Sequence, residues 1–110
     1  MRIIEGAGAF TAPGSAPNHY VQQLRVDDLS VGTYSIPAGG IDDQTPHAED
    51  EVYVVWRGRA RLETPEGSVP VSPGSVVYVP AGESHRFVEI QEDLALLVLF
   101  APPYGSRKRG

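Results

Sequence analysis

Short runs of β-branched and aromatic residues, each bounded by glycine, proline, aspartate or serine, are the feature that most constrains the fold of this chain. Eight such runs follow one another, over residues 20–26, 30–37, 51–57, 60–64, 68–71, 75–80, 85–90 and 94–100. Runs of this length and composition are typical of β-strands, and the residues between them are typical of turns. The pattern predicts an all-β sandwich or barrel of about eight strands with little or no helix.

The chain length of 110 residues fits one domain with one hydrophobic core,. Residues 1–19, rich in Gly, Ala, Pro and Ser, show no apolar period and are expected to form an irregular N-terminal arm,. Residues 20–102 are expected to form the barrel. Residues 103–110 contain Arg107, Lys108 and Arg109 and are expected to be a basic, solvated C-terminal tail rather than a recognition motif,.

Two of the expected strands, residues 52–56 and 94–100, are apolar on both faces. In a closed barrel only one face of a strand points inward, so the outward face of these two runs needs a second cover. We predict a homodimer formed through this sheet face. The alternative is that the N-terminal arm folds back over it.

The composition excludes several classes of function and ligand. A formal net charge of −5 argues against nucleic acid as a partner, because binding to phosphate backbones requires positive charge,. The chain has no cysteine, so a metal ion would have to bind imidazole, carboxylate or amide oxygen,. It shows neither the apolar segment of a signal peptide nor a run of roughly 18–20 apolar residues. A cytoplasmic protein with no membrane partner is the simplest prediction.

His47 and His85 each lie at the start of an apolar run, just after a turn. His47 and Glu51 are four residues apart, so on an extended strand they share one face with Thr45 and Tyr53,. Two imidazoles and one carboxylate match an arrangement that holds a divalent transition metal with open coordination positions. A salt bridge or an ordinary surface pair is the alternative at this spacing.

The other polar residues have simpler expectations. Glu49 and Asp50 are expected to form a solvated acidic corner rather than a second metal site. His19 is expected to be exposed in a loop, with the alternative that it belongs to an arm that caps the barrel mouth.

Two segments carry a family resemblance. Residues 39–58, GGIDDQTPHAEDEVYVVWRG, resemble the first motif of the cupin family: Gly, five residues, His-x-His, three or four residues, Glu, six residues, Gly. The residues on this pattern are Gly39, His47, Glu51 and Gly58. Residues 74–89, GSVVYVPAGESHRFVE, resemble the second cupin motif: Gly, five residues, Pro-x-Gly, two residues, His, three residues, Asn. The residues that match it are Gly74, Pro80, Gly82 and His85.

The resemblance implies the double-stranded β-helix of cupins, a jelly-roll-like barrel. It also implies one divalent transition metal ion, Fe, Mn, Zn or Ni, with His47, Glu51 and His85 as its ligands.

The chain departs from each of the two motifs at one position. Thr45 stands where the family has the first histidine of His-x-His, and Glu89 stands in place of the closing asparagine. A hydroxyl is a poor ligand for such ions, so the fourth position is expected to be taken by water, Gln44 or Asp43. Strict alternation along a strand would point Gln44 away from the metal, unless a proline at position 46 distorts the strand,.

Inward-facing residues near the ligands are expected to line a small substrate pocket, namely Thr45, Tyr53 and Phe87. Cupins include dioxygenases and enzymes in which the ion is a Lewis acid for isomerase or lyase chemistry. We therefore predict a small metalloenzyme that acts on a small organic molecule, with Glu51 and Tyr53 as its catalytic residues. The alternative is a non-catalytic cupin that binds a small molecule and uses the ion to stabilise the barrel.

Overall fold

The computed structural model describes residues 1–107. Its eight strands are β1 (His19–Arg25), β2 (Ser30–Ile36), β3 (Asp50–Arg57), β4 (Ala60–Thr64), β5 (Gly67–Val71), β6 (Val76–Val79), β7 (Arg86–Val88) and β8 (Leu94–Ala101). Each strand overlaps one of the apolar runs, and no helix occurs in this part of the chain. The described residues therefore contain no helix that could cross a membrane.

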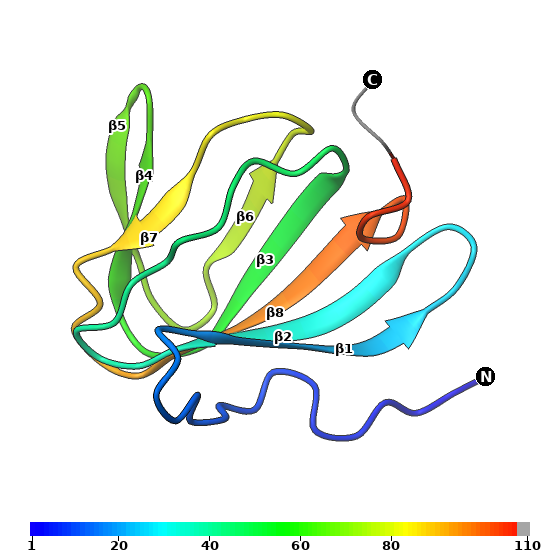
Figure 1. Ribbon diagram of the computed structural model, residues 1–110, viewed down its shortest axis with the longest axis horizontal. Helices are drawn as coiled ribbons and strands as arrows, with labels where there is room; N and C mark the ends of the chain where they lie inside the picture. Colours follow the sequence, from blue (N-terminus) through cyan, green and yellow to red (C-terminus); the bar gives the residue numbers. More distant parts are fainter. Residues whose placement is uncertain (108–110) are drawn as a thin grey trace.

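The strands form two antiparallel sheets, which Figure 1 shows on opposite sides of the molecule. The larger sheet has the order β1-β2-β8-β3-β6, and the smaller one has the order β5-β4-β7. Strand β8, the last in the chain, lies between β2 and β3 and pairs with both. This arrangement confirms the predicted double-stranded β-helix.

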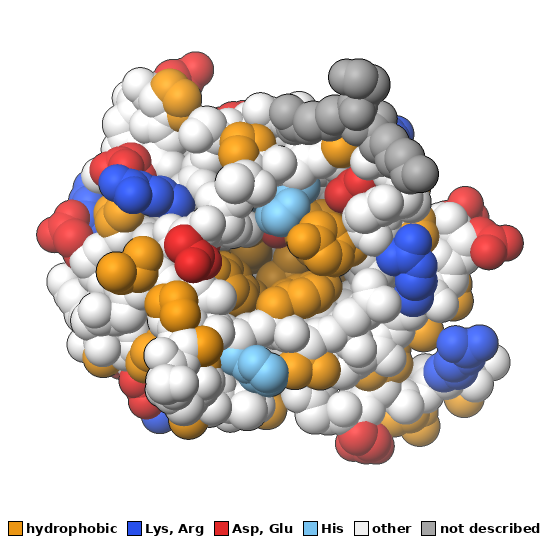
Figure 2. Space-filling model, in the orientation of Figure 1, with side chains coloured by type: hydrophobic (Ala, Val, Ile, Leu, Met, Phe, Trp, Pro, Cys, Tyr) orange, Lys and Arg blue, Asp and Glu red, His pale blue; other side chains and the backbone are white. Residues whose placement is uncertain are grey.

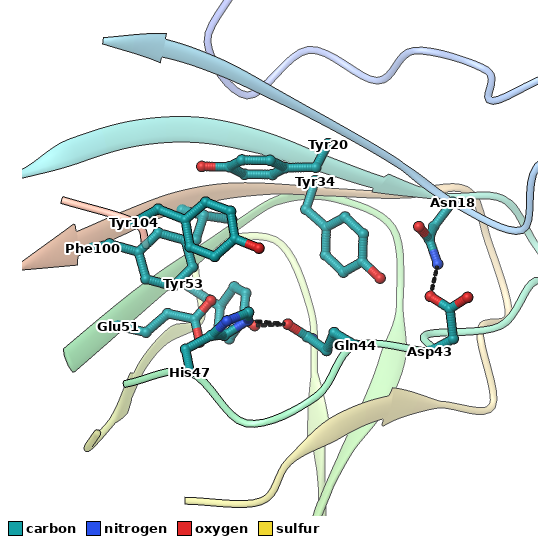
Figure 3. A pocket seen from close by; sticks show the side chains of 11 residues that line it. Asn18, Tyr20, Tyr34, Asp43, Gln44, His47, Glu51, Tyr53, Phe100 and Tyr104 are labelled. Atoms are coloured by element: carbon teal, nitrogen blue, oxygen red, sulfur yellow. Dashed lines mark hydrogen bonds between the residues drawn. The ribbon is translucent and has the colours of Figure 1, made fainter. Parts of the chain in front are cut away.

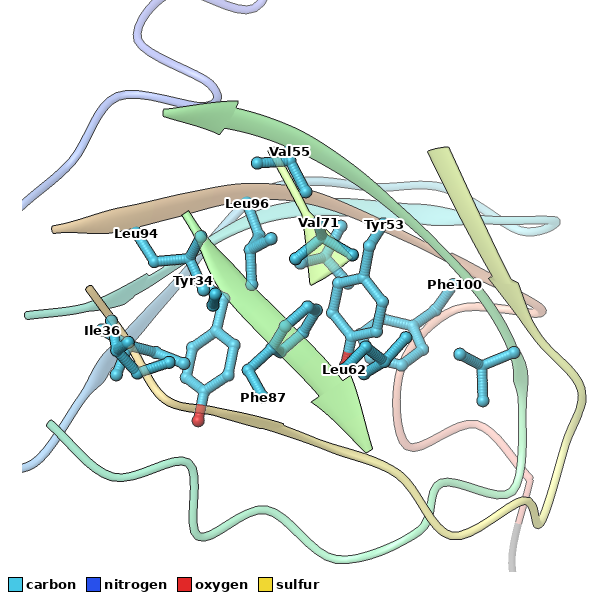
Figure 4. Close-up of a cluster of buried hydrophobic side chains, with 14 residues drawn as sticks. Tyr34, Ile36, Tyr53, Val55, Leu62, Val71, Phe87, Leu94, Leu96 and Phe100 are labelled. Atoms are coloured by element: carbon cyan, nitrogen blue, oxygen red, sulfur yellow. The ribbon is translucent and has the colours of Figure 1, made fainter. Parts of the chain in front are cut away.

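Alternating side chains of the two sheets form one core between the layers. In β3, Glu51, Tyr53 and Val55 are buried, whereas the residues between them are partly exposed, as the period of a strand requires,. The ring of Phe87, from β7 in the smaller sheet, meets the ring of Tyr53 edge to face at 5.0 Å and 85° (Figure 4). This pair joins the two sheets, and the Tyr53 hydroxyl lies 2.9 Å from Nε2 of His85, one of the expected metal ligands.

The N-terminal arm covers part of the outward face of the larger sheet (Figure 1). The Gly8 amide donates a hydrogen bond to Thr33 Oγ1 of β2 at 2.8 Å, and the Thr11 amide donates one to Ser35 Oγ of the same strand at 3.1 Å. At the edge of the sheet Val76 and Tyr78 of β6 remain 67% and 60% exposed. The alternative of an arm folded back thus accounts for part of this face, and the homodimer stays a prediction.

The described part of the expected tail, residues 103–107, folds back onto the barrel. The Tyr104 amide donates to Ser30 Oγ at 3.0 Å, and the Tyr104 carbonyl accepts a hydrogen bond from Arg25 at 2.6 Å. The Arg107 amide donates to Glu49 Oε2 at 3.0 Å. Glu49 is only 2% exposed, so the expectation that it is solvated is wrong: it accepts a hydrogen bond from a segment distant in sequence. Lys108 lies outside the described residues, as does Arg109.

Candidate metal centre

A cavity of about 160 Å³ opens between the larger sheet and the loop of residues 37–49, and Figure 2 shows it as a hollow with hydrophobic side chains inside. Its walls are mostly aromatic rings, from Tyr20, Tyr34, Tyr53, Phe100 and Tyr104 (Figure 3). Two of these rings, Phe100 and Tyr104, stack at 4.9 Å and both contact the edge or face of His47. The segment after β8 therefore completes the cavity wall.

Polar side chains gather at one corner of this cavity and form a continuous series of close contacts. His47 Nε2 lies 3.0 Å from Gln44 Oε1, and the two side chains point toward one another in Figure 3. The Tyr53 hydroxyl lies 3.0 Å from the same Gln44 oxygen and 2.9 Å from His85 Nε2. His85 Nε2 in turn lies 3.2 Å from Glu51 Oε1. The topology thus brings together His47, Glu51 and His85, with Tyr53 and Gln44 between them.

The positions of these donor atoms can be tested against the requirements of a metal ion. Within residues 1–107, no three His, Asp or Glu side chains are by themselves arranged to hold an ion. The His47 and His85 ring centroids are 6.1 Å apart, and Gln44 and Tyr53 fill the space between them. Two ligands about 2.1 Å from one ion lie roughly 3.0–3.4 Å apart. The contact of His85 with Glu51 has this length.

Two further observations support the fit. Glu51 is 2% exposed, and its Oε1 lies 3.2 Å from His85 Nε2 without a hydrogen bond of good geometry from the described residues. His85 Nδ1 lies 2.9 Å from the Glu83 carbonyl and donates to it, which leaves Nε2 facing the corner. Metal-binding histidines are usually oriented in this way by a second hydrogen bond. The donor chemistry of this corner, imidazole and carboxylate, therefore suits a divalent transition metal, while the three side chains as placed within residues 1–107 do not form a complete site,.

Burial is the largest influence on the pKa of three side chains at this corner, His47, Tyr53 and His85. It lowers the pKa of His47, which favours the neutral imidazole that binds metals,. It raises the pKa of Tyr53 well above its usual value, and the Glu51 charge adds to the effect. For His85 burial acts to lower the pKa, but the Glu51 carboxylate and the Glu83 carbonyl outweigh it, so the pKa is raised.

Several expected site residues lie elsewhere than predicted. Strand β3 begins at Asp50, so residues 44–49 are not extended in a strand and alternation does not fix their direction. Gln44 points into the cavity, held by hydrogen bonds to Asp42, whereas Thr45 is exposed and does not line the cavity. Phe87 does not line it either, because it is buried behind Tyr53. His19 begins β1 rather than lying in a loop, and it is half-buried.

Asp42, which no sequence motif singles out, is the hydrogen-bond acceptor that positions the residues of this corner. Asp42 is 3% exposed. Its Oδ1 accepts hydrogen bonds from the Tyr34 hydroxyl at 2.8 Å and from the backbone amide of Gln44 at 3.2 Å. Its Oδ2 accepts from Gln44 Nε2 at 2.7 Å and from the Phe87 amide at 2.8 Å. One carboxylate thus fixes the loop of residues 37–49 to both sheets.

Known proteins share both the sequence motifs and the barrel fold of this chain. A family model described as a cupin domain covers residues 32–101. The chain belongs to the cupin family. This cupin is 52% identical over 84 residues to an uncharacterized protein of Streptomyces coelicolor, a match that covers 76% of this chain and 80% of that protein.

Two more distant similarities are informative. The cupin is 39% identical over 57 residues to the glucose-6-phosphate isomerase of Pyrococcus abyssi, a stretch that is 47% of this chain and only 30% of the isomerase. A conserved protein with a double-stranded β-helix domain from Klebsiella pneumoniae has a TM-score of 0.76 at 16% identity over 84% of each chain. This structural similarity supports the fold.

Two cavity tyrosines differ in their hydroxyl partners and give a first prediction. Tyr20 Oη is buried and has no hydrogen-bond partner among residues 1–107, whereas Tyr34 Oη donates to Asp42. We expect Tyr20→Phe to leave the free energy of unfolding unchanged or to raise it by up to about 1 kcal/mol. Tyr34→Phe is expected to lower it by about 1.5–3 kcal/mol, because a hydrogen bond to a carboxylate is lost. Urea unfolding of both variants measures this, and equal losses would show that Tyr20 has a partner.

Proposed function

We propose that this cupin binds one divalent transition metal ion, Fe, Mn, Zn or Ni, through His47, Glu51 and His85. We further propose that it acts there on a small organic molecule. The observation that carries the proposal is the 3.2 Å contact of His85 Nε2 with Glu51 Oε1 at the buried corner of the cavity. A buried carboxylate oxygen without a hydrogen bond costs free energy, and a bound cation would offset that cost,.

The size and charge of the cavity limit the substrate class. The cavity of about 160 Å³ is close to the engineered cavities of about 150 Å³ that hold benzene,. Its lining contains phenols and carboxylates but no lysine or arginine among the described residues. Phosphate groups are usually bound by those cations or by helix N-termini. We therefore expect a small, uncharged, oxygen-bearing molecule, unlike the phosphorylated sugar for which the Pyrococcus abyssi isomerase is named.

We propose Lewis-acid chemistry of the isomerase or lyase type, and the partial identity with an isomerase supports it. When bound, the ion would polarise a carbonyl or hydroxyl oxygen of the substrate. A phenol is protonated at neutral pH, and the raised pKa of Tyr53 favours this form further, so Tyr53 would donate a hydrogen bond to a substrate oxygen and would not act as a base,. Glu51 is the carboxylate at the same corner, and it would have to leave the ion in order to accept a proton from the substrate. Phe100 and Tyr104 would restrict the access of water.

A dioxygenase is the second candidate. Two histidines and one carboxylate with open positions are the ligand set of non-haem Fe(II) oxygenases, and His47, His85 and Glu51 would provide that set. The non-catalytic alternative also remains, in which the ion would stabilise the barrel by joining β3 to the loops that carry the two histidines. The homodimer and the cytoplasmic location remain predictions.

The second prediction tests metal binding. His85→Ala and His47→Ala are each expected to weaken Mn²⁺ or Zn²⁺ binding by at least about 100-fold, because each removes a ligand from a three-residue set. Titration calorimetry on metal-free protein measures the affinity, and elemental analysis measures the ion retained during purification. His19→Ala is the matched control, because His19 does not line the cavity. An unchanged affinity in both test variants would refute the proposed site.

The type of chemistry can be separated in the same preparations. Iron together with substrate-dependent uptake of O₂ would favour the dioxygenase, whereas zinc, manganese or nickel with no O₂ uptake would favour the Lewis acid. If metal binding raises the melting temperature and a panel of small carbonyl compounds is neither bound nor converted, the structural role is supported instead.

A further inference from the structure

We infer that the Gln44 amide oxygen is a ligand of the metal ion, in place of a side chain at position 45. We further infer that Asp42 is the positioning residue that turns this oxygen toward the ion. The inference rests on the proposed function, because it concerns the same ion. It assigns the coordination position that the family motif leaves open in this chain.

The residue at the motif position is unsuited to be the ligand. Thr45 is exposed and is absent from the cavity lining, so its hydroxyl lies on the outer side of the loop. Asp43 is also a poor candidate, because its Oδ1 accepts a hydrogen bond from Asn18 Nδ2 at 2.8 Å at the rim. In Figure 3 this pair lies on the far side of Gln44 from His47.

Gln44 lines the cavity, whereas Thr45, the residue at the motif position, does not. Gln44 Oε1 is 3.0 Å from His47 Nε2 and 3.0 Å from the Tyr53 hydroxyl, and that hydroxyl is 2.9 Å from His85 Nε2. Ligand atoms of one ion lie roughly 3.0–3.4 Å apart, so the separation of the Gln44 oxygen and the His47 nitrogen suits a shared ion. Carbonyl oxygen is an accepted ligand for Mn²⁺ and related ions.

Asp42 fixes which atom of the amide faces the corner. An ionised carboxylate only accepts hydrogen bonds, so the amide atom 2.7 Å from Asp42 Oδ2 must be the Nε2 donor,. If the amide were reversed, its oxygen would face the Asp42 carboxylate and its NH₂ group would face His47. The backbone amide of Gln44 donates to the same carboxylate at 3.2 Å and holds the residue in place. The oxygen is therefore preorganised toward the metal.

The test compares neighbouring residues of one loop in the metal-free full chain. Gln44→Ala is expected to weaken Mn²⁺ binding about 10–100-fold, as measured by titration calorimetry, because an oxygen ligand is lost. Thr45→Ala is the matched control and is expected to change the affinity less than about twofold, since an exposed side chain away from the ion contributes little. The visible absorption of bound Co²⁺ reports coordination number and geometry, and it should change in Gln44→Ala alone.

The possible results separate the two proposals. If the wild-type chain binds neither Mn²⁺ nor Co²⁺, the proposed function fails and this inference fails with it. If the wild type binds and Gln44→Ala keeps both the affinity and the Co²⁺ spectrum, only this inference is overturned. A loss in Thr45→Ala instead would assign the ligand to the motif position. Should Gln44→Ala not fold, a crystal structure of the Mn²⁺-loaded wild type decides: Gln44 Oε1 within about 2.4 Å of the ion supports the inference, and a longer distance refutes it.

Discussion

Replacement of Asp42 by alanine is expected to lower the free energy of unfolding by about 4 kcal/mol, because this carboxylate is the buried acceptor for four donors,. A hydrogen bond to a charged group contributes about 1.5–3 kcal/mol, and a donor left buried without an acceptor adds its desolvation cost. The Phe87 amide is buried and would lose its acceptor completely. The Gln44 donors lie on a loop that can move toward water, so the total stays below the sum of four separate losses.

The loss is measured by urea unfolding in the presence of EDTA, so that metal binding contributes nothing to the difference. Asp43→Ala is the matched control, because the Asp43 carboxylate is exposed and, among residues 1–107, accepts a hydrogen bond from Asn18 alone. Its expected cost is within about 0.5 kcal/mol, as for most surface substitutions. Equal losses in the two variants would mean that Asp42 does not join the loop to the sheets.

The strands could be predicted from the sequence because their information is local. Burial alternates in β3 as its residue pattern indicates, with Glu51 and Tyr53 inward. The turns are formed by residue types that can be recognised in the sequence. One of them is Gly67, which has a φ of 131° where the turn between β4 and β5 ends. The way in which β8 enters between β2 and β3 is not local, and the resemblance to cupins implied the type of barrel without giving this strand order.

The candidate site was only partly predictable, because half of it lies outside strands. The motifs brought His47, Glu51 and His85 to one corner, since Glu51 belongs to β3 and the two histidines to the loops before β3 and β7. The direction of Gln44 could not be derived, because strand alternation does not apply before Asp50. It depends on Asp42, whose own partners include an amide 45 residues away in the chain.

The aromatic wall shows the same limit. Tyr104 lies beyond the last strand, where the composition indicates a solvated tail, yet it stacks on Phe100 and lines the cavity. Its position depends on hydrogen bonds of its backbone to Ser30 and Arg25. No pattern within residues 103–110 carries that information. Phe87 shows the opposite error. It was expected to line the cavity because it lies two residues after His85, but its side chain is buried in the core.

The glycine that closes the first cupin motif gives the second large prediction. Gly58 has a φ of +93°, and a Cβ added there would lie 2.3 Å from the Asp93 carbonyl oxygen. That oxygen belongs to the backbone just before β8, so it cannot move without displacing the central strand of the larger sheet. Gly58→Ala is therefore expected to lower the free energy of unfolding by about 4 kcal/mol, from backbone strain and a steric clash together.

Gly74 separates these two contributions, because it has nearly the same backbone angle but open space around it. Its φ is +94°, and an added Cβ would meet nothing within 4 Å. Gly74→Ala is expected to cost only the backbone strain, about 1–2 kcal/mol. Urea unfolding of the two alanine variants in EDTA gives the steric contribution by subtraction. If Gly74→Ala costs as much as Gly58→Ala, the close approach of Asp93 does not explain the glycine, and both motif positions require glycine only for their backbone angle.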